Sequence, residues 1–263
     1  MKQIRLAIHG AAGRMGQRLV ALAHADPAIT IVAALESAAH PRIGEDAGLL
    51  VWTGPIGVRL SSRLEVPAEV VVDFSTAGAL EGVLQLCLEK QLPLVVATTG
   101  LSEAQQAAVQ AAGQQIPLVW APNMSLAVNL TLKLAEVAAS ALTDKDADVE
   151  IVERHHRFKE DSPSGTALKF GQKIAAIMGQ AVHRHGRSGR PGARPHGEIG
   201  YHAIRAGDNP GEHTIVFAMP GESIELTVRA TSRDCYALGA LSAAKFLPGK
   251  RPGTYSIQDV LGL

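Results

Sequence analysis

The segment that decides the fold is IRLAIHGAAGRMGQRLVAL, residues 4–22. Its first five residues place isoleucine or leucine at every second position, a period typical of a β-strand. Met15, Leu19 and Leu22 then recur at helical spacing. The glycines between these two patterns permit a sharp turn, because glycine adopts backbone conformations that other residues avoid. The segment therefore predicts a strand, a tight turn and a helix in immediate succession.

The turn GAAGRMG, residues 10–16, is typical of nucleotide-binding proteins. Its backbone N–H groups can approach a pyrophosphate, and the N-terminus of the following helix favours the same anion. The spacing GxxGxxG differs from the commonest GxGxxG, and a tight strand–helix connection in any α/β protein would look similar. Glu36 ends the next predicted strand, at roughly the 20-residue separation at which dinucleotide-binding folds place an acid against the ribose hydroxyls. Together the two features favour dinucleotide binding.

The residues after Glu36 bear on the choice of cofactor. Ser37 stands where an arginine would help to hold the 2′-phosphate of NADP. His40 and Arg42 lie close by and can substitute for it. The sequence therefore favours NAD(H), with NADP(H) as the alternative.

The chain changes in character after residue 125. Before it, short apolar runs alternate with helical patterns, which predicts β–α–β units and a Rossmann-like parallel sheet. Strands are predicted at residues 30–35, 70–74, 94–97 and 118–121, and helices at 79–89 and 102–114. After it, the pattern predicts a second α+β domain with a mixed or antiparallel sheet. Its predicted elements are helices at 125–142 and 165–178, strands at 149–154, 199–206, 213–218 and 224–230, and a closing helix at 236–246.

Charge and cysteine content exclude several classes of protein. The 263 residues carry 25 Lys and Arg against 25 Asp and Glu, so zero net charge gives no global attraction to nucleic acid or to anionic membranes. The two cysteines form no CxxC motif, which argues against a disulfide scaffold and a thiolate zinc site. The N-terminus lacks the apolar core of a secretion signal, and no apolar run reaches the ~18 residues of a membrane span. We therefore expect a cytoplasmic protein with no membrane partner.

One segment is strongly basic. Residues 183–196 contain Arg184, Arg187, Arg190 and Arg194 without any acid, and they predict a loop. The segment lacks the interleaved aromatic residues of many nucleic-acid-binding surfaces. A solvated loop or a subunit contact is therefore favoured over a nucleic-acid interface.

The densest group of chemically active residues is ERHHRFKEDSPSGT, residues 153–166. The adjacent His155 and His156 can donate or accept a proton, and Lys159 can supply a proton or hold a carboxylate. The Ser-Gly-Thr run at residues 164–166 opens a predicted helix, where it either grips an anion or simply caps the helix. The combination predicts a carboxylated substrate. A metal site is disfavoured because adjacent strand histidines point to opposite sides and no third ligand has metal spacing.

Further polar stretches follow the predicted strands. ATTG at residues 97–100 and APNM at residues 121–124 stand where open α/β sheets bind ligands. Gly, Pro and Asn also favour ordinary turns, so the alternative is turn chemistry alone. Arg233 follows the last predicted sheet strand and can pair with a substrate carboxylate or with a surface acid.

These motifs together resemble the 4-hydroxy-tetrahydrodipicolinate reductase family of bacterial lysine biosynthesis, over nearly the whole chain. The string HHRxKxDxPSGTA, residues 155–167, is highly specific. The other segments that carry the resemblance are AIHGAAGRMG (7–16), DFS (73–75), ATTG (97–100), APNMSLAVN (121–129), EIGYHAIRAGDNPGEHTIVFA (198–218) and ATSRD (230–234).

The resemblance implies an NAD(P)H-dependent oxidoreductase of the diaminopimelate pathway that forms tetrahydrodipicolinate and assembles as a homotetramer. It implies a dinucleotide-binding domain at residues 1–125, onto which residues 236–263 pack back, and a substrate-binding and oligomerisation domain at residues 126–235. The implied catalytic residues are His155 and Lys159, and the implied substrate-binding residues are His156, Ser164, Gly165, Thr166 and Arg233. The implied cofactor contacts are Gly10, Ala11, Ala12, Gly13, Arg14, Met15, Glu36, Ala97, Thr98, Thr99, Ala121, Pro122, Asn123 and Met124.

Three positions depart from the family pattern. Ala97 stands where glycine is frequent, Phe158 replaces a frequently polar residue, and Ser37 replaces an arginine common in members that use NADPH. The alternative to an enzyme is a non-catalytic NAD(H)-sensing module. The combination of His155, Lys159 and residues 164–166 argues against it, because a sensor needs no proton donor beside a carboxylate-binding turn.

Overall fold

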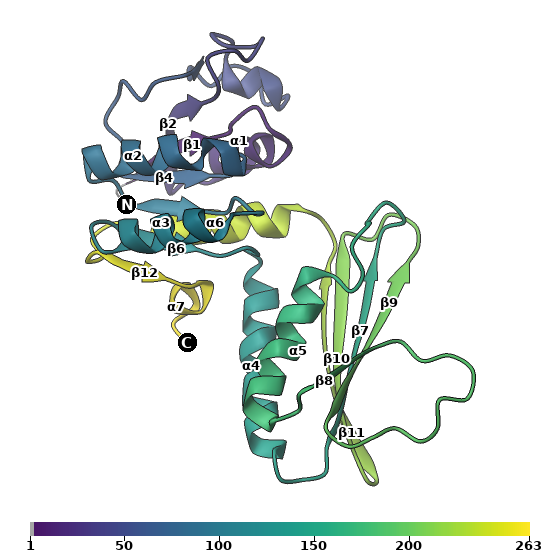
Figure 1. Cartoon of the computed structure of the whole chain (residues 1–263). Coiled ribbons are helices and arrows are strands. Elements are labelled where there is room, and N and C mark those ends of the chain that lie inside the picture. The colour runs from purple at the N-terminus through teal and green to yellow at the C-terminus, as the bar shows by residue number, and fades with distance from the viewer. Residues whose placement is uncertain (1–2) are drawn as a thin grey trace. The chain divides into compact units, whose positions relative to one another are not determined.

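The computed structural model describes residues 3–263. Its chain divides into two compact units. The first unit runs to Leu126 and resumes at Asp234–Leu263, and the second is formed by Ala127–Arg233. The first unit is therefore assembled from two stretches that are separated in sequence by the whole second unit. Figure 1 shows the elements of both units.

The first unit contains a seven-stranded sheet in which all paired strands are parallel. The strand order is β12-β6-β5-β4-β1-β2-β3. The strands are β1 (Ile4–His9), β2 (Ile29–Leu35), β3 (Leu60–Ser61), β4 (Val70–Asp73), β5 (Leu94–Val96), β6 (Pro117–Trp120) and β12 (Gly253–Tyr255). The helices are α1 (Arg14–Ala25), α2 (Leu80–Lys90), α3 (Glu103–Gly113), α6 (Asp234–Phe246) and α7 (Ile257–Leu261), with short 3₁₀ turns η1 (Ala47–Leu50) and η2 (Ala77–Ala79).

Successive residues of the central strands face opposite sides of this sheet, and both sides are covered. Leu6 and Ile8 of β1 belong to a core that includes residues of α1 and α6. Ala7, between them, belongs to a second core that includes residues of α2 and α3. Burial on both faces is the reason that these strands read as continuous apolar runs. The predicted Rossmann-like parallel sheet is confirmed.

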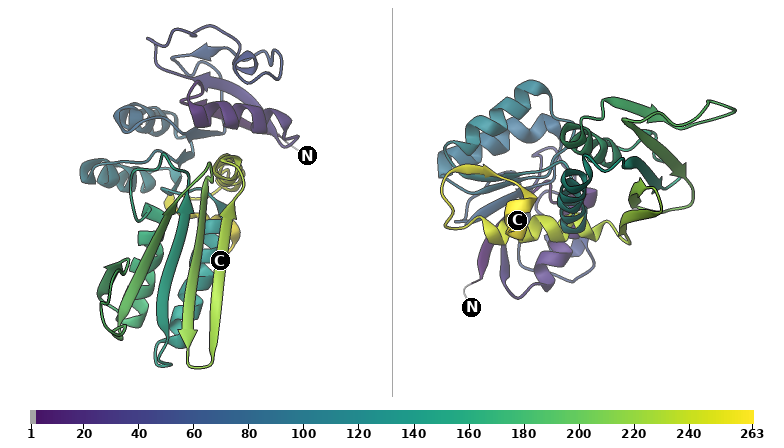
Figure 2. Two further views of the ribbon diagram at one scale, coloured as in Figure 1. Left: turned by 90° about the vertical axis from the view of Figure 1, so that its right-hand side faces the viewer. Right: turned by 90° about the horizontal axis from the view of Figure 1, so that it is seen from below.

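The second unit is a mixed five-stranded sheet with two helices on one face (Figures 1 and 2). Strand β10 pairs antiparallel with β7 and β11, whereas β9 pairs parallel with β7 and β8. The core between sheet and helices contains the fully buried Phe170 and Phe217. The predicted second α+β domain is confirmed. Its elements are α4 (Leu126–Leu142), β7 (Asp148–His155), α5 (Gly165–Met178), β8 (Val182–His185), β9 (Glu198–Arg205), β10 (Gly211–Met219) and β11 (Glu222–Ala230).

The prediction of a loop over residues 183–196 is wrong for its first part, which is strand β8. This strand lies at the edge of the sheet, and all four of its residues are exposed. An edge strand without a buried face shows no alternation of apolar and polar residues, so the sequence pattern does not reveal it. Pairing with β9 and the stacking of His183 and His185 on Tyr201 hold it in place.

The loop after β8 is anchored by acids from distant parts of the chain. Arg187 pairs with Glu150 at 2.6 Å and with Glu198 at 2.5 Å, and Arg194 pairs with Glu150 at 2.9 Å. Burial raises the pKa of Glu150, but hydrogen bonds from Arg187 and Arg194 outweigh this and lower it to about 2. Part of the positive charge of the basic segment is therefore neutralised within its own unit.

The closing tail adds structure that the sequence pattern leaves unassigned. Strand β12 extends the parallel sheet beside β6, and helix α7 begins with a capping box between Ser256 and Asp259. Among the described residues, no helix is long and apolar enough to cross a membrane.

Candidate active site

The glycine turn joins β1 to α1, and close packing requires its glycines. Gly10 has a φ of +77°, and a Cβ atom there would lie 2.9 Å from the carbonyl oxygen of Phe74. A Cβ atom on Gly16 would lie 2.0 Å from the carbonyl oxygen of Gly10. Helix α1 follows Gly13, an N-cap residue that supplies no side-chain acceptor. The turn therefore offers a helix N-terminus suited to an anion.

Glu36, directly after β2, reaches back to this turn. One of its carboxylate oxygens accepts a hydrogen bond from the backbone N–H of Ala12 at 3.1 Å. The other oxygen accepts one from the N–H of Ser37 at 2.9 Å. These residues fit a dinucleotide, because a tightly packed turn for the pyrophosphate lies beside a carboxylate suited to ribose hydroxyls.

Fully buried Asp73 joins three strand ends at one edge of the sheet. It ends β4 and contacts Nδ1 of His9, at the end of β1, at 2.7 Å. It also accepts hydrogen bonds from Oγ1 of Thr98 at 2.7 Å and from Oγ of Ser75 at 2.6 Å. Thr98 is among the predicted site residues, whereas Asp73 and His9 are not. The sequence signal for Asp73 was a single acid at the end of the apolar run VVVD.

The other cofactor candidates lie at the carboxyl ends of neighbouring strands. Residues 97–99 follow β5 and residues 121–124 follow β6, which is paired with β5. Oδ1 of Asn123 accepts a hydrogen bond from the N–H of Ser125 at 2.9 Å. The carbonyl of Met124 contacts α6 so closely that a Cβ atom on Gly239 would lie 1.8 Å from it. The first unit thus brings its polar strand ends to the edge where open α/β sheets bind ligands.

In the second unit, the carboxylate of Glu153 is the centre of a buried polar cluster. Its oxygens contact Nδ1 of His155 at 2.5 Å and the guanidinium of Arg205 at 2.7 and 2.8 Å. A third contact comes from the N–H of Ser164 at 3.1 Å. Burial raises the pKa of Glu153, but the hydrogen bonds from His155 and Arg205 outweigh it and lower the pKa to about 2. Glu153 is therefore a carboxylate at neutral pH.

A second buried histidine lies against the same cluster. Nε2 of His213 is 3.0 Å from Oγ of Ser164, and its ring meets that of His155 edge-on with centroids 5.2 Å apart. Burial, together with the neighbouring His155, lowers the pKa of His213 to about 4. His213 is therefore neutral at pH 7. Glu153, Arg205 and His213 were not among the predicted site residues.

The remaining predicted residues of residues 153–166 differ in their hydrogen-bond partners. Ser164 is the N-cap of α5, and its hydroxyl oxygen accepts a hydrogen bond from the N–H of Ala167 at 3.2 Å. Gly165 and Thr166 form the first turn of that helix. Lys159 contacts Asp161 at 2.7 Å, and the carbonyl of Asp161 accepts a hydrogen bond from Arg205.

The two other predicted substrate-binding residues, His156 and Arg233, differ in burial. Nδ1 of His156 is buried and has no hydrogen-bond partner within residues 3–263. Arg233 is exposed after β11, and no hydrogen bond or ion pair between described residues connects it to the Glu153 cluster. The second unit therefore brings together His155, Ser164 and the start of α5.

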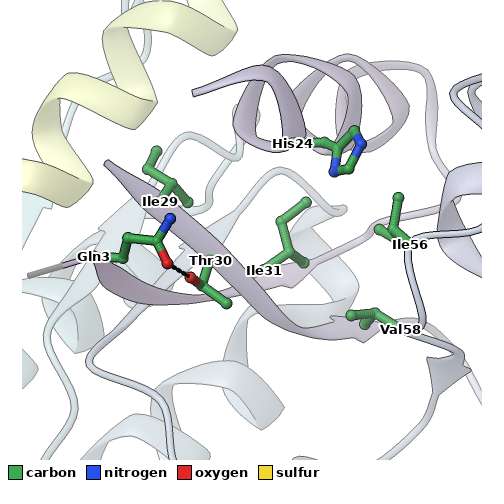
Figure 3. Close-up of a pocket in the computed structure, with 7 residues that line it drawn as sticks. All are labelled: Gln3, His24, Ile29, Thr30, Ile31, Ile56 and Val58. Carbon is green, nitrogen blue, oxygen red and sulfur yellow. Dashed lines mark hydrogen bonds between the residues drawn. The ribbon is translucent and has the colours of Figure 1, made fainter. Parts of the chain in front are cut away.

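A pocket of about 250 Å³ lies elsewhere on the first unit (Figure 3). A hydrogen bond joins two of its lining residues, Gln3 and Thr30. The lining residues are Gln3, His24, Ile29, Thr30, Ile31, Ile56 and Val58, none of which is a candidate site residue. Among residues 3–263, no group of three or more His, Cys, Asp and Glu side chains is arranged to hold a metal ion.

Comparison with known proteins identifies the class and then the family. Residues 4–124 match the family model described as "Dihydrodipicolinate reductase, N-terminus", and residues 127–261 match "Dihydrodipicolinate reductase, C-terminus". Together with the Rossmann-like first unit, these matches define an oxidoreductase. The chain belongs to the dihydrodipicolinate reductase family.

Full-length relatives support this membership. The chain is 54% identical to a 4-hydroxy-tetrahydrodipicolinate reductase of Rhodopirellula baltica, with 99% of this chain and 96% of that protein covered. It is 50% identical to the reductase of the same name from Alkalilimnicola ehrlichii, with 98% and 99% covered. A solved dipicolinate-bound dihydrodipicolinate reductase from Paenisporosarcina sp. TG-14 shares the fold, with a TM-score of 0.78, 24% identity and 97% of each chain covered.

Proposed function

We propose that this chain reduces 4-hydroxy-tetrahydrodipicolinate to tetrahydrodipicolinate in the diaminopimelate route to lysine. The observation that carries the proposal is the buried His155, held by Glu153 beside the N-terminus of α5, in a chain of this family. Two relatives with at least 50% identity bear the name of this activity. No observation favours the alternative of a non-catalytic sensing module.

The first unit is proposed to hold a nicotinamide dinucleotide. Residues 10–15 line the pyrophosphate, which the N–H groups of Arg14 and Met15 at the start of α1 bind. Glu36 binds a ribose, and residues 97–99 and 121–124 contact the rest of the molecule. The bound reduced nicotinamide supplies the hydride. NAD(H) is preferred over NADP(H), because the carboxylate of Glu36 repels a 2′-phosphate and Ser37 offers no positive charge to offset that repulsion.

The second unit is proposed to hold the substrate and to move protons. The N–H groups at the start of α5, from Gly165 and Thr166, bind a carboxylate with help from the Ser164 hydroxyl. The unpartnered Nδ1 of His156 and the guanidinium of Arg233 bind the substrate carboxylates as well. His155 donates or accepts a proton through Nε2, since its Nδ1 is held by Glu153. Lys159 is a second proton donor.

Location and assembly follow from the family resemblance. We propose a cytoplasmic homotetramer whose contacts are made by the second unit, with no nucleic-acid or membrane partner. Light scattering on the purified chain tests the assembly, and a monomer at micromolar concentration would contradict it.

Initial rates with NADH and NADPH test the activity and the cofactor preference in one experiment. We expect oxidation of both cofactors with enzymatically prepared substrate, and a higher kcat/KM for NADH. No oxidation under conditions in which a known reductase works would refute the proposed function. His155→Ala and Lys159→Ala should lose kcat by roughly 10²–10⁴-fold, the contribution typical of a proton-transferring side chain, and keep the affinity for NADH. Lys173→Ala is the matched control, because this lysine of α5 pairs with Glu136.

A further inference from the structure

One carboxylate sets the geometry of the whole polar cluster in the second unit. Glu153 is fully buried, and each of its two oxygens accepts two hydrogen bonds. One oxygen takes Nδ1 of His155 and one guanidinium nitrogen of Arg205. The other takes the N–H of Ser164 and the second guanidinium nitrogen. Strand β7, strand β9 and the start of α5 therefore meet on a single side chain.

We propose that Glu153 is a positioning residue for the reduction: it fixes the tautomer and direction of the His155 imidazole and, with the same carboxylate, the backbone at the carboxylate-binding start of α5. The inference rests on the proposed function. A histidine that donates its Nδ1–H to a carboxylate presents its other nitrogen, Nε2, to a reacting group. Because the two tasks share one carboxylate, the proton donor and the anion-binding turn are held at a fixed separation.

The surroundings of the two buried histidines show why only one of them is placed for proton transfer. His155 contacts the carboxylate directly, whereas His213 faces the Ser164 hydroxyl and is kept neutral by burial. Lys159 and Arg205 also bear positive charge next to this pair and further disfavour a charge on His213. Of the two imidazoles, only that of His155 contacts the carboxylate of Glu153.

Arg205 completes the arrangement, and among residues 3–263 its side chain makes no hydrogen bond to the His155 imidazole. Its guanidinium binds both oxygens of Glu153 and donates a hydrogen bond to the carbonyl of Asp161, in the segment between His155 and α5. If the Glu153–Arg205 pair served stability alone, removal of either partner would have the same effect on turnover. If Glu153 positions His155, removal of Glu153 must affect turnover much more than removal of Arg205.

Glu150 provides a matched control on the same strand. It contacts two arginines and His202, the latter at 2.7 Å, so it has the same kinds of partner as Glu153. The pKa of both carboxylates is lowered to about 2 against the effect of burial. Glu150→Gln therefore reproduces the loss of a half-buried carboxylate paired with arginine, without touching the proposed site.

The test compares Glu153→Gln, Arg205→Gln and Glu150→Gln by kcat, KM and ¹⁵N NMR of the imidazole nitrogens, with His155 assigned from a His155→Asn spectrum. We expect Glu153→Gln to lower kcat by roughly 10- to 100-fold, as for other residues that orient a functional histidine, with a smaller change in KM. We expect its ¹⁵N spectrum to show that the Nδ1–H form of His155 is no longer the dominant neutral tautomer. Glu150→Gln should keep the wild-type tautomer and most of kcat, and Arg205→Gln should keep the tautomer and lower kcat much less than Glu153→Gln does.

Each outcome decides for or against the proposal. A wild-type tautomer and an unchanged kcat in Glu153→Gln would overturn it, as would equal losses of kcat in Glu153→Gln and Arg205→Gln. If Glu153→Gln does not fold, Glu153→Asp decides by the same two measurements, because it keeps the charge but is too short to reach both His155 and Ser164. If the wild-type chain shows no turnover, the proposed function fails, while the NMR comparison still tests the positioning of His155.

Discussion

Alanine at Gly16 and alanine at Gly82 should change the stability of the first unit in opposite directions. Both glycines lie in helices, α1 and α2 respectively. A Cβ atom on Gly16 would lie 2.0 Å from the carbonyl oxygen of Gly10 and 2.7 Å from the Cα of Ala11, whereas a Cβ atom on Gly82 meets nothing within 4 Å. The 2.0 Å contact at Gly16 is about 1 Å shorter than the contacts that Cβ atoms make in proteins. Because the contacted atom belongs to the backbone of Gly10, the glycine turn itself has to move.

The size of each effect follows from two opposing free energies. Alanine in a helix is favoured over glycine by up to ~1 kcal/mol. Overpacking typically costs about 1–3 kcal/mol, so Gly16→Ala should lower the free energy of unfolding by up to ~2 kcal/mol. Gly82→Ala meets no such contact and should raise it by ~0.5–1 kcal/mol. Because the displaced backbone is the proposed pyrophosphate site, Gly16→Ala should also weaken NADH binding by about tenfold for each 1.4 kcal/mol of lost binding free energy.

Differential scanning calorimetry and NADH fluorescence titration measure these two quantities. A change of 1 kcal/mol corresponds to roughly 2–4 °C in Tm for a unit of this size. We expect a lower Tm and weaker NADH binding for Gly16→Ala, and a slightly higher Tm with unchanged binding for Gly82→Ala. A Gly16→Ala variant with wild-type stability and NADH affinity would show that the close approach of α1 to the turn is not what requires glycine there.

Three further outcomes are expected. Gly211→Ala should lower kcat by about tenfold and leave NADH affinity unchanged, because its Cβ would lie 3.0 Å from Nε2 of His155; a wild-type kcat would contradict this. Thr98→Val should destabilise the first unit by ~1–3 kcal/mol in urea unfolding, because it leaves the buried carboxylate of Asp73 with one partner fewer. The pKa of Glu150 is lowered from 4.5 to about 2 in the folded chain. The ionised carboxylate therefore contributes fully to the free energy of unfolding above pH 4.5, and this contribution is lost as the pH falls towards 2. As the pH is lowered, the free energy of unfolding should therefore fall less steeply for Glu150→Gln than for the wild type. Identical curves would refute the lowered pKa of Glu150.

Local sequence was sufficient for the features that depend on near neighbours. The helix predicted at 102–114 is α3, which begins with a capping box between Ser102 and Gln105. The glycine turn was placed from its own seven residues, and the helix predicted at 165–178 is α5 without any shift. Periodicity, caps and turns act over a few residues, so the sequence shows them directly.

The contacts that make the site depend on strand pairing and are invisible in the sequence. Arg205 is 52 residues from Glu153, and it reaches Glu153 because β9 pairs parallel with β7 in a register that opposes Arg205 to His155. His213 meets Ser164, 49 residues away, through the antiparallel pairing of β10 with β7. The sequence alone thus determined the two sheet types, the glycine turn and the chemically active segment at 153–166. Only the tertiary structure decided which carboxylate holds His155, because the strand register that brings these side chains together is fixed by packing across the whole sheet.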